Sequence, residues 1–175
     1  LNDDFGGSNS STKYLIQNGH KKIAFASLHI KDGGVLMERF LGYKAALTEA
    51  GIPFDESLVF ECGMDLKGTR AIAKTSHPEI TGVVTTADTL AGSIIANLHK
   101  LKIKIPEQVS VVGFDDLSIC NIIEPPLTSI HQDMDLKGRI AVDFMLQLLE
   151  HKKPKQYEVL LHTSITERNS VRTIS

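Results

Sequence analysis

The chain has 175 residues, of which 42% are hydrophobic and 23% are charged, a composition typical of a globular protein with a sizeable core. Its formal charge of −2 argues against direct nucleic-acid binding by this segment, because neutralising phosphates requires a clustered excess of Lys and Arg. No apolar run reaches the length of a membrane span, and no signal peptide is recognisable. Because the first residue is Leu1 instead of Met, we expect the chain to be a fragment.

The residue types that most often hold metals are sparse and unclustered. Cys62 and Cys120 lack both the spacing of a metal site and the density of a disulfide framework, so we expect buried or idle reduced thiols in a cytoplasmic protein. The 7 histidines show no HxxxH or HExxH spacing. The sequence therefore predicts no metal site and no cofactor.

The first half of the chain predicts alternating helices and strands. Leu36, Phe40 and Tyr43 recur at helical spacing, and Gly51 followed by Pro53 is a stop signal for that helix. The predicted elements are a turn at residues 4–8, a helix at 11–18, a strand at 21–28, a helix at 35–50, a strand at 58–61 and a helix at 66–74.

The second half continues the alternation. Leu136, Ile140 and Phe144 recur with a spacing of about four residues, which predicts another amphipathic helix. The predicted elements are a strand at 82–86, a helix at 88–101, a strand at 109–114, a short helix at 117–123, a helix at 135–150 and strands at 158–161 and 164–168. This order predicts an α/β fold with a doubly wound parallel sheet and right-handed crossovers.

The strand at 109–114 ends in two acids, Asp115 and Asp116. Ligands of open α/β sheets bind at the carboxyl ends of strands, and an ionised carboxylate accepts hydrogen bonds in two directions. Asp115 is therefore a candidate ligand contact. The alternative is a turn or helix-capping acid, which is the preferred interpretation for Asp116.

Several motifs follow one another in the order found in one known family. They are GHKKIAF at residues 19–25, RFLGYKAAL at 39–47, TADTLA at 86–91, IPEQVSVVGFDD at 105–116, PPLTSIHQ at 125–132 and RNS at 168–170. Together they resemble the LacI/GalR family of bacterial transcription regulators. The resemblance implies a type I periplasmic-binding-protein-like effector domain, in which a small molecule binds between two doubly wound subdomains.

The resemblance also implies a domain division. Residues 1–22 and 130–155 are expected to be remnants of the N-terminal subdomain, whereas residues 23–129 and 156–175 are expected to form the C-terminal subdomain. A helix-turn-helix domain that reads operator DNA is absent from this chain and is expected to precede it. A homodimer is expected because palindromic operators mirror a two-fold axis.

Arg39 and Asp115 occupy positions that contact the effector in the resembling regulators. We expect them to converge on one hollow and to pair with each other, although a solvated helix arginine remains the alternative for Arg39. Ala87 stands where many family members carry Asn, so it is expected to line the site without a side-chain hydrogen bond. This departure argues against assuming a common hexose as the ligand.

Three more residues are candidates for the same site. Gln132 and Met134 match positions that face the effector in the resembling regulators, and their alternatives are a polar hinge residue and a core methionine. His29, like His131, lies where it can face the cleft, or it is an ordinary loop residue.

The leading hypothesis is the effector-sensing domain of a LacI-type repressor that binds a sugar-like molecule and controls DNA binding allosterically. A periplasmic sugar-binding receptor of a transport system is the alternative. The sequence upstream distinguishes them, since a regulator has a helix-turn-helix there and a receptor has a signal peptide. The chain lacks GxSxG, a P-loop and GxGxxG after a strand, so it is not predicted to be an enzyme.

Overall fold

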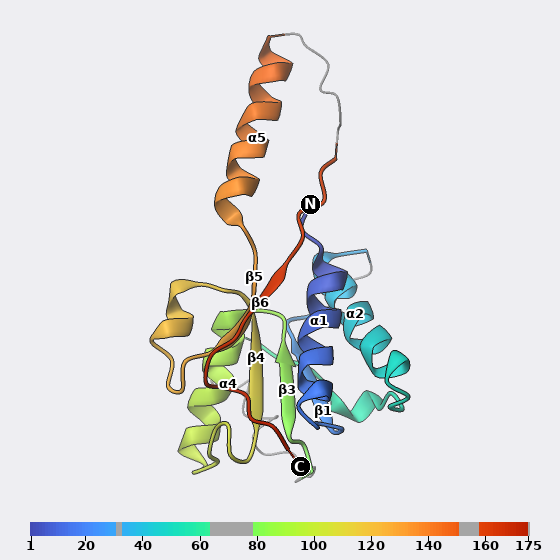
Figure 1. Ribbon diagram of the computed structural model, residues 1–175, viewed down its shortest axis with the longest axis vertical. Coiled ribbons are helices and arrows are strands. Elements are labelled where there is room, and N and C mark those ends of the chain that lie inside the picture. The colour runs from blue at the N-terminus through green and yellow to red at the C-terminus, as the bar shows by residue number, and fades with distance from the viewer. Residues whose placement is uncertain (31–32, 64–78, 151–157, 175) are drawn as a thin grey trace.

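The computed structural model describes residues 1–30, 33–63, 79–150 and 158–174 (Figure 1). These residues form a 6-stranded sheet in the order β2-β1-β3-β4-β5-β6. All neighbouring strands are parallel except β5 and β6, which are antiparallel. The strands are β1 (Ile23–Ser27), β2 (Val59–Glu61), β3 (Gly82–Thr85), β4 (Ser110–Asp115), β5 (Thr128–His131) and β6 (Ser164–Thr166).

The helices fall close to the predicted ranges. They are α1 (Asp4–Gln17), α2 (Val35–Glu49), α4 (Asp88–Lys100) and α5 (Met134–Leu149), with short 3-10 helices η1 (Glu56–Leu58) and η2 (Ser118–Asn121). The helix predicted at residues 66–74 lies outside the described residues. Among the described helices, none is both long enough and apolar enough to cross a membrane. The α/β fold with a mainly parallel sheet is confirmed.

Both faces of the sheet are buried, as expected for parallel strands covered by crossover helices. Along β1, Ile23 and Phe25 pack on the side of Leu15 and Tyr43, which belong to α1 and α2. The intervening Ala24 and Ala26 pack on the opposite side, with residues of α4. Because side chains alternate along a strand, residues of β1 contribute to two hydrophobic cores, one on each face of the sheet.

Helix α1 begins earlier than the sequence pattern suggested. Asp3 caps it by accepting a hydrogen bond from the Gly6 N–H, and Gly6 and Gly7 lie inside the helix instead of in a turn. A Cβ on Gly7 would lie 2.8 Å from the Phe114 ring, and one on Gly42 of α2 would lie 2.2 Å from a backbone oxygen of α1. These glycines therefore allow close packing, and the turn predicted at residues 4–8 was wrong.

The two segments expected to belong to the N-terminal subdomain, residues 1–22 and 130–155, pack differently. Helix α1 packs along α2 and contacts β3 to β6, so its residues lie with the sheet, contrary to the expectation for residues 1–22. Helix α5 stands away from the sheet and has no buried residue (Figure 1). Helix α1 thus packs with the sheet, whereas no residue of α5 is buried.

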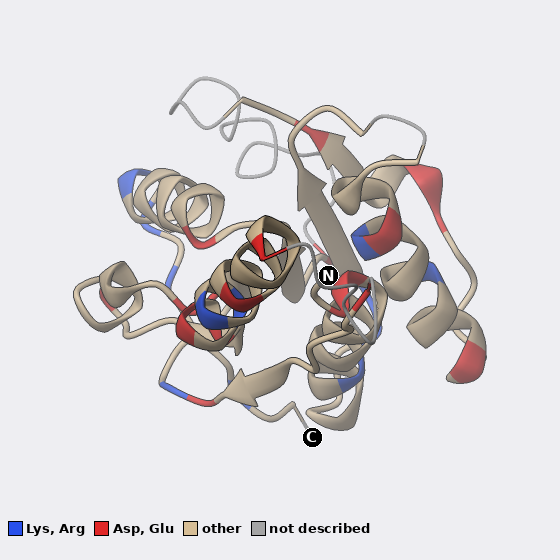
Figure 2. Ribbon diagram, turned by 90° about the horizontal axis from the view of Figure 1, so that it is seen from above, with Lys and Arg blue, Asp and Glu red and all other residues tan. Residues whose placement is uncertain are grey.

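Charged side chains are dispersed over the ribbon. Seen from above, Lys and Arg occur among Asp and Glu on several helices (Figure 2). The arrangement agrees with the formal charge of −2.

Candidate functional site

Arg39 and Asp115 meet at the carboxyl edge of the sheet. Arg39 lies in the second turn of α2 and Asp115 ends β4, and their Nη2 and Oδ1 atoms are 3.6 Å apart. Only 8% of the Arg39 side chain and 30% of the Asp115 side chain are exposed. The pairing expected from the sequence is therefore present, and it lies where parallel α/β sheets bind ligands.

The tighter partner of Arg39 is Asp4, the first residue of α1. Arg39 donates from Nε to Asp4 Oδ1 at 2.8 Å, and its Nη2 lies 2.7 Å from the same oxygen. Its Nη1 donates to the backbone oxygen of Thr86, at the end of β3, and its guanidinium carbon lies 3.6 Å from the Phe114 ring centroid. Arg39 thus fastens α1 and α2 to the ends of two strands.

Sequence reasoning missed Asp4 because it was assigned to a turn. An acid near the start of a helix is usually explained by the helix dipole alone. The structure gives it a second role, since its carboxylate is only 12% exposed and pairs with a guanidinium that is also buried. A buried acid and a buried arginine stabilise each other when their hydrogen bonds are made.

Asp115 also binds Gln132, which follows β5. The Gln132 Nε2 donates a 2.6 Å hydrogen bond to Asp115 Oδ1, and Gln132 is only 6% exposed. Burial raises the pKa of Asp115 to about 6, and the nearby positive charge of Arg39 opposes this shift. Asp88 and Asp4 add repulsion that raises the pKa further. The carboxylate is therefore partly desolvated and lies between the Gln132 amide donor and the Arg39 guanidinium.

Asp116 belongs to a separate cluster next to the site. Arg168 Nη2 lies 2.8 Å from one of its carboxylate oxygens, while Thr166 donates to the other at 2.9 Å and His131 Nδ1 lies 3.0 Å from it. Burial raises the pKa of Asp116, but the hydrogen bonds from Arg168, Thr166 and His131 outweigh it and leave the pKa lowered. Asp116 thus ties β4 to β5 and β6 through its side chain, which is a different role from the turn or helix-capping acid expected from the sequence.

The remaining candidate residues, Ala87, Met134 and His29, make no described side-chain contact with Arg39 or Asp115. Ala87 is the N-cap residue of α4 and makes no side-chain capping bond. Met134 is 55% exposed at the start of α5. His29 follows β1, is 75% exposed, and lies 2.7 Å from Glu61 at the end of β2. The described contacts therefore join Gln132 to the pair directly, but they join neither Met134 nor His29 to it.

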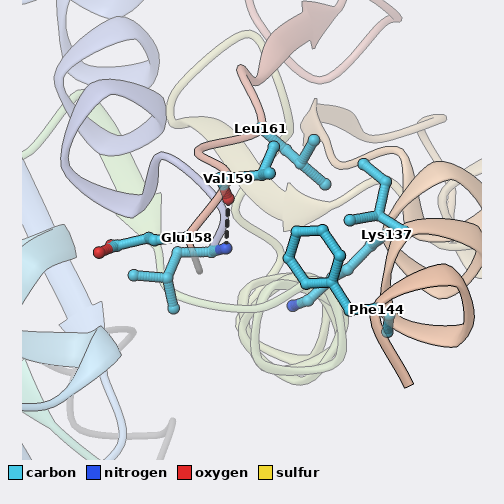
Figure 3. Close-up of a pocket in the computed structure, with 8 residues that line it drawn as sticks. Lys137, Phe144, Glu158, Val159 and Leu161 are labelled. Carbon is cyan, nitrogen blue, oxygen red and sulfur yellow. Dashed lines mark hydrogen bonds between the residues drawn. The ribbon is translucent and has the colours of Figure 1, made fainter. Parts of the chain in front are cut away.

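A separate cavity of about 250 Å³ lies between α5 and the segment that precedes β6 (Figure 3). Phe144 and Lys137 of α5 face Val159 and Leu161 across it. Neither Arg39 nor Asp115 lines this cavity. Its mainly apolar lining offers few groups for polar recognition, so the convergent side chains at the sheet edge remain the better candidate site.

Both cysteines lie in the described part of the chain. Cys62 and Cys120 are both buried. Burial raises the pKa of Cys120 to about 12, which keeps its thiol protonated and unreactive. Within the described ranges, no group of 3 or more His, Cys, Asp or Glu side chains is placed to hold a metal ion.

Comparison with known proteins identifies the family. A family model described as a periplasmic-binding-protein-like domain matches residues 12–171. The chain belongs to this family. The HTH-type transcriptional repressor PurR of Vibrio atlanticus (strain LGP32) is 35% identical over 173 residues, covering 97% of this chain and 51% of the relative. The chain therefore spans about half the length of the curated relatives it matches.

Solved structures of LacI-type regulators share the fold closely. The transcription regulator CcpA of Lactococcus lactis is 31% identical, with a TM-score of 0.89 over 98% of this chain and 64% of that one. A CelR–cellobiose complex is 29% identical, with a TM-score of 0.88 over 96% of this chain and 52% of that one. The resemblance to LacI-family regulators is confirmed: this is their effector-binding domain. These relatives are transcription regulators and not enzymes.

Proposed function

We propose that this LacI-family domain senses a polar small molecule through Arg39, Asp115 and Gln132, and that the molecule is a sugar or a sugar derivative. The observation that carries the proposal is the convergence of Arg39 and Gln132 on one carboxylate oxygen of Asp115 at the carboxyl edge of the sheet. A carboxylate accepts hydrogen bonds from two hydroxyls, and a guanidinium donates to oxygens in a planar fork.

The residues around Arg39 and Asp115 favour a ligand that makes few hydrogen bonds on the side of Ala87. Ala87 contributes a methyl group where an amide would add two more hydrogen-bonding atoms. We propose that Ala87, Met134 and His29 complete the wall of the site. The CelR relative, whose structure is a complex with cellobiose, supports a sugar-like molecule as the first class to test.

We further propose that ligand binding changes the angle between two subdomains, with the hinge between β5 and α5. The boundary is supported by the contrast between the buried Gln132 and the exposed helix that follows it. In a cytoplasmic homodimer this angle sets the spacing of two helix-turn-helix domains on operator DNA. Coupling of this kind amounts to about 1–3 kcal/mol and acts equally in both directions.

A periplasmic receptor of a transport system is the alternative function for the same fold. The relatives named above are transcription regulators, and this supports the regulator. The sequence upstream of Leu1 in the full-length protein decides between the two, because it encodes either a helix-turn-helix or a signal peptide.

A thermal-shift screen of the full-length protein tests the proposed site. The panel contains D-ribose, cellobiose, ribose 5-phosphate and adenine, which represent sugars, sugar phosphates and nucleobases. A ligand that binds only the native state raises the unfolding temperature. We expect a sugar or sugar phosphate to do so in the wild type and to lose the effect in Asp115→Asn. A shift that is the same in both proteins would refute the assignment of Asp115.

A further inference from the structure

The backbone that presents Asp115 has an unusual conformation. Asp115 has a φ of 106° and Asp116 a φ of 54°, so two successive residues with side chains lie in the left-handed region. Such conformations are unfavourable for residues other than glycine and persist only when their surroundings hold them.

This conformation decides where the carboxylate of Asp115 lies. Successive side chains of a regular strand point to opposite faces of the sheet. Phe114 and Asp115 are successive, yet both side chains lie against Arg39. The guanidinium carbon of Arg39 is 3.6 Å from the Phe114 ring centroid, and its Nη2 is 3.6 Å from the Asp115 carboxylate oxygen. The positive φ at Asp115 therefore turns its carboxylate toward the guanidinium.

Two buried side chains hold the turn that follows β4. Asp88 accepts a 2.7 Å hydrogen bond from the Leu117 N–H and a 2.6 Å hydrogen bond from the Ser129 hydroxyl. The Ser129 oxygen in turn accepts a 3.2 Å hydrogen bond from the Asp116 N–H. The two amides after Asp115 are thus bound to α4 and β5 through one connected network.

The network is built into the core and is not a surface contact. Asp88 and Ser129 are both 0% exposed. Gly113 makes room for the acid, because a Cβ at that position would lie 2.2 Å from Asp88 Oδ1. Burial raises the pKa of Asp88, and the donors from Ser129 and Leu117 oppose the shift. Burying a carboxylate costs free energy unless its oxygens accept hydrogen bonds, and both oxygens of Asp88 do so here.

We propose that Asp88 and Ser129 are positioning residues that hold the turn after β4 and thereby keep the Asp115 carboxylate against Arg39 and Gln132. The inference rests on the proposed function of Asp115 as an effector contact. The described bonds of Asp88 run to the turn, to β5 and to Cys120 of η2, whereas an acid that only capped α4 would bond to that helix's own amides.

A matched pair of serine substitutions tests the proposal in the full-length protein. Ser129→Ala removes the hydroxyl that links Asp88 to the Asp116 amide. Ser170→Ala is the control, because Ser170 is also 0% exposed and also bridges β4 and β5, through Val111 and Thr128, but does not touch the turn. Both substitutions remove one buried hydroxyl with two hydrogen bonds.

The readout is the NMR signal of the Gln132 side-chain amide, which reports its bond to Asp115 without any ligand. We expect this signal to move toward that of a solvated glutamine in Ser129→Ala and to stay in place in Ser170→Ala. Hydrogen exchange of the Asp116 and Leu117 amides should also quicken about tenfold more in Ser129→Ala, corresponding to the loss of one hydrogen bond. Equal responses in the two variants, or an unmoved Gln132 signal, would overturn the proposal.

Asp88→Asn provides a second variant that keeps the size of the side chain. Leu117 and Ser129 donate to different oxygens of Asp88, and Asn replaces one of these acceptors with an NH2 donor, so one of the two bonds is lost. We therefore expect the Gln132 signal to move in the same direction as in Ser129→Ala. If the signal moves in these variants while Asp115→Asn leaves the binding of every panel compound unchanged, the positioning role stands and the proposed effector role of Asp115 fails.

Discussion

Gln132 donates a 2.6 Å hydrogen bond to the same Asp115 oxygen that lies 3.6 Å from Arg39 Nη2. Gln132 stands between β5 and α5, so this one oxygen connects α2, β4 and the start of the exposed helix. A ligand hydroxyl that binds this oxygen shares it with the Gln132 amide and the Arg39 guanidinium, or replaces one of them. Binding at Asp115 is therefore linked to the position of the segment that leads into α5.

Replacing the Asp115 carboxylate should weaken ligand binding without unfolding the domain. Asparagine tolerates positive φ better than most residues, so Asp115→Asn adds little strain to the turn. We expect the dissociation constant of a responding panel compound to rise by about 10- to 100-fold, as for the loss of a charged hydrogen bond. Calorimetric titration measures this, and Asp143→Asn on the exposed face of α5 is the control.

The elevated pKa of Asp115 predicts a pH-dependent stability. Its pKa in the folded protein is about 6, against an ordinary value of 3.8, so the folded state binds more protons between these two values. Stability should therefore fall as pH rises from about 4 to about 6, by about 2–3 kcal/mol for this group. Asp116, with its lowered pKa, contributes in the opposite sense as pH falls.

The contribution of Asp115 is isolated by comparing the wild type with Asp115→Asn. Asparagine does not titrate, so the difference in unfolding free energy between the two proteins should change in favour of the variant as pH rises through this window. Urea denaturation at pH 4, 5, 6 and 7 measures it. A difference that stays constant with pH would show that Asp115 titrates at its ordinary value.

Removing Arg39 should cost far more than removing a surface cation. Arg39→Ala leaves the buried Asp4 carboxylate without its main partner, and we expect a loss of about 3–5 kcal/mol in unfolding free energy. Arg39→Lys should recover only part of it, because Arg39 reaches Asp4 and the Thr86 carbonyl from different nitrogens of its planar fork, and lysine has a single nitrogen. Lys13→Ala, which breaks an exposed pair with Glu49, should change little. Equal losses for Arg39→Ala and Lys13→Ala would contradict this account.

The alternating elements of the fold were predictable because their signals are local. Helix α2 shows its apolar spacing within its own sequence, and β4 ends in Gly113 followed by Phe114 and an acid pair. The rule that ligands meet carboxyl ends of parallel strands then placed Asp115 near the site. These inferences needed no knowledge of which helix packs on which.

The parts that escaped prediction depend on contacts between distant segments. Asp4 reaches Arg39 across 35 positions, and Asp88 reaches Ser129 across 41 positions. Gly7 suggested a turn because nothing in its local sequence explains a glycine inside a helix. The explanation is the Phe114 ring of β4, which leaves no room for a Cβ at this position. A single sequence gives the type of such residues but not their partners, so their local interpretation was chosen.

Two glycines in helices should respond oppositely to alanine. At Gly42 an added Cβ would lie 2.2 Å from the Phe5 backbone oxygen, so Gly42→Ala must push α1 and α2 apart and should cost about 1–3 kcal/mol. Gly138 in α5 has no atom within 4 Å of an added Cβ, so Gly138→Ala should stabilise that helix by about 0.5–1 kcal/mol. Thermal denaturation monitored by circular dichroism measures both. Equal effects would contradict the close packing of α1 on α2.

Ala87 offers a gain of stability at the site itself. It is the N-cap residue of α4, with an extended backbone at φ −165° and ψ 148°, and no side chain caps the helix there. Ala87→Asn supplies an acceptor for the first helical amides and should raise stability by about 1 kcal/mol. Ala87→Val is the control, because it adds volume without an acceptor. Differential scanning calorimetry compares the two variants. If Ala87→Asn is no more stable than Ala87→Val, these amides gain nothing from a side-chain cap.

The same Ala87→Asn protein, screened against the panel of compounds named above, should show larger thermal shifts than the wild type if the added amide reaches the ligand.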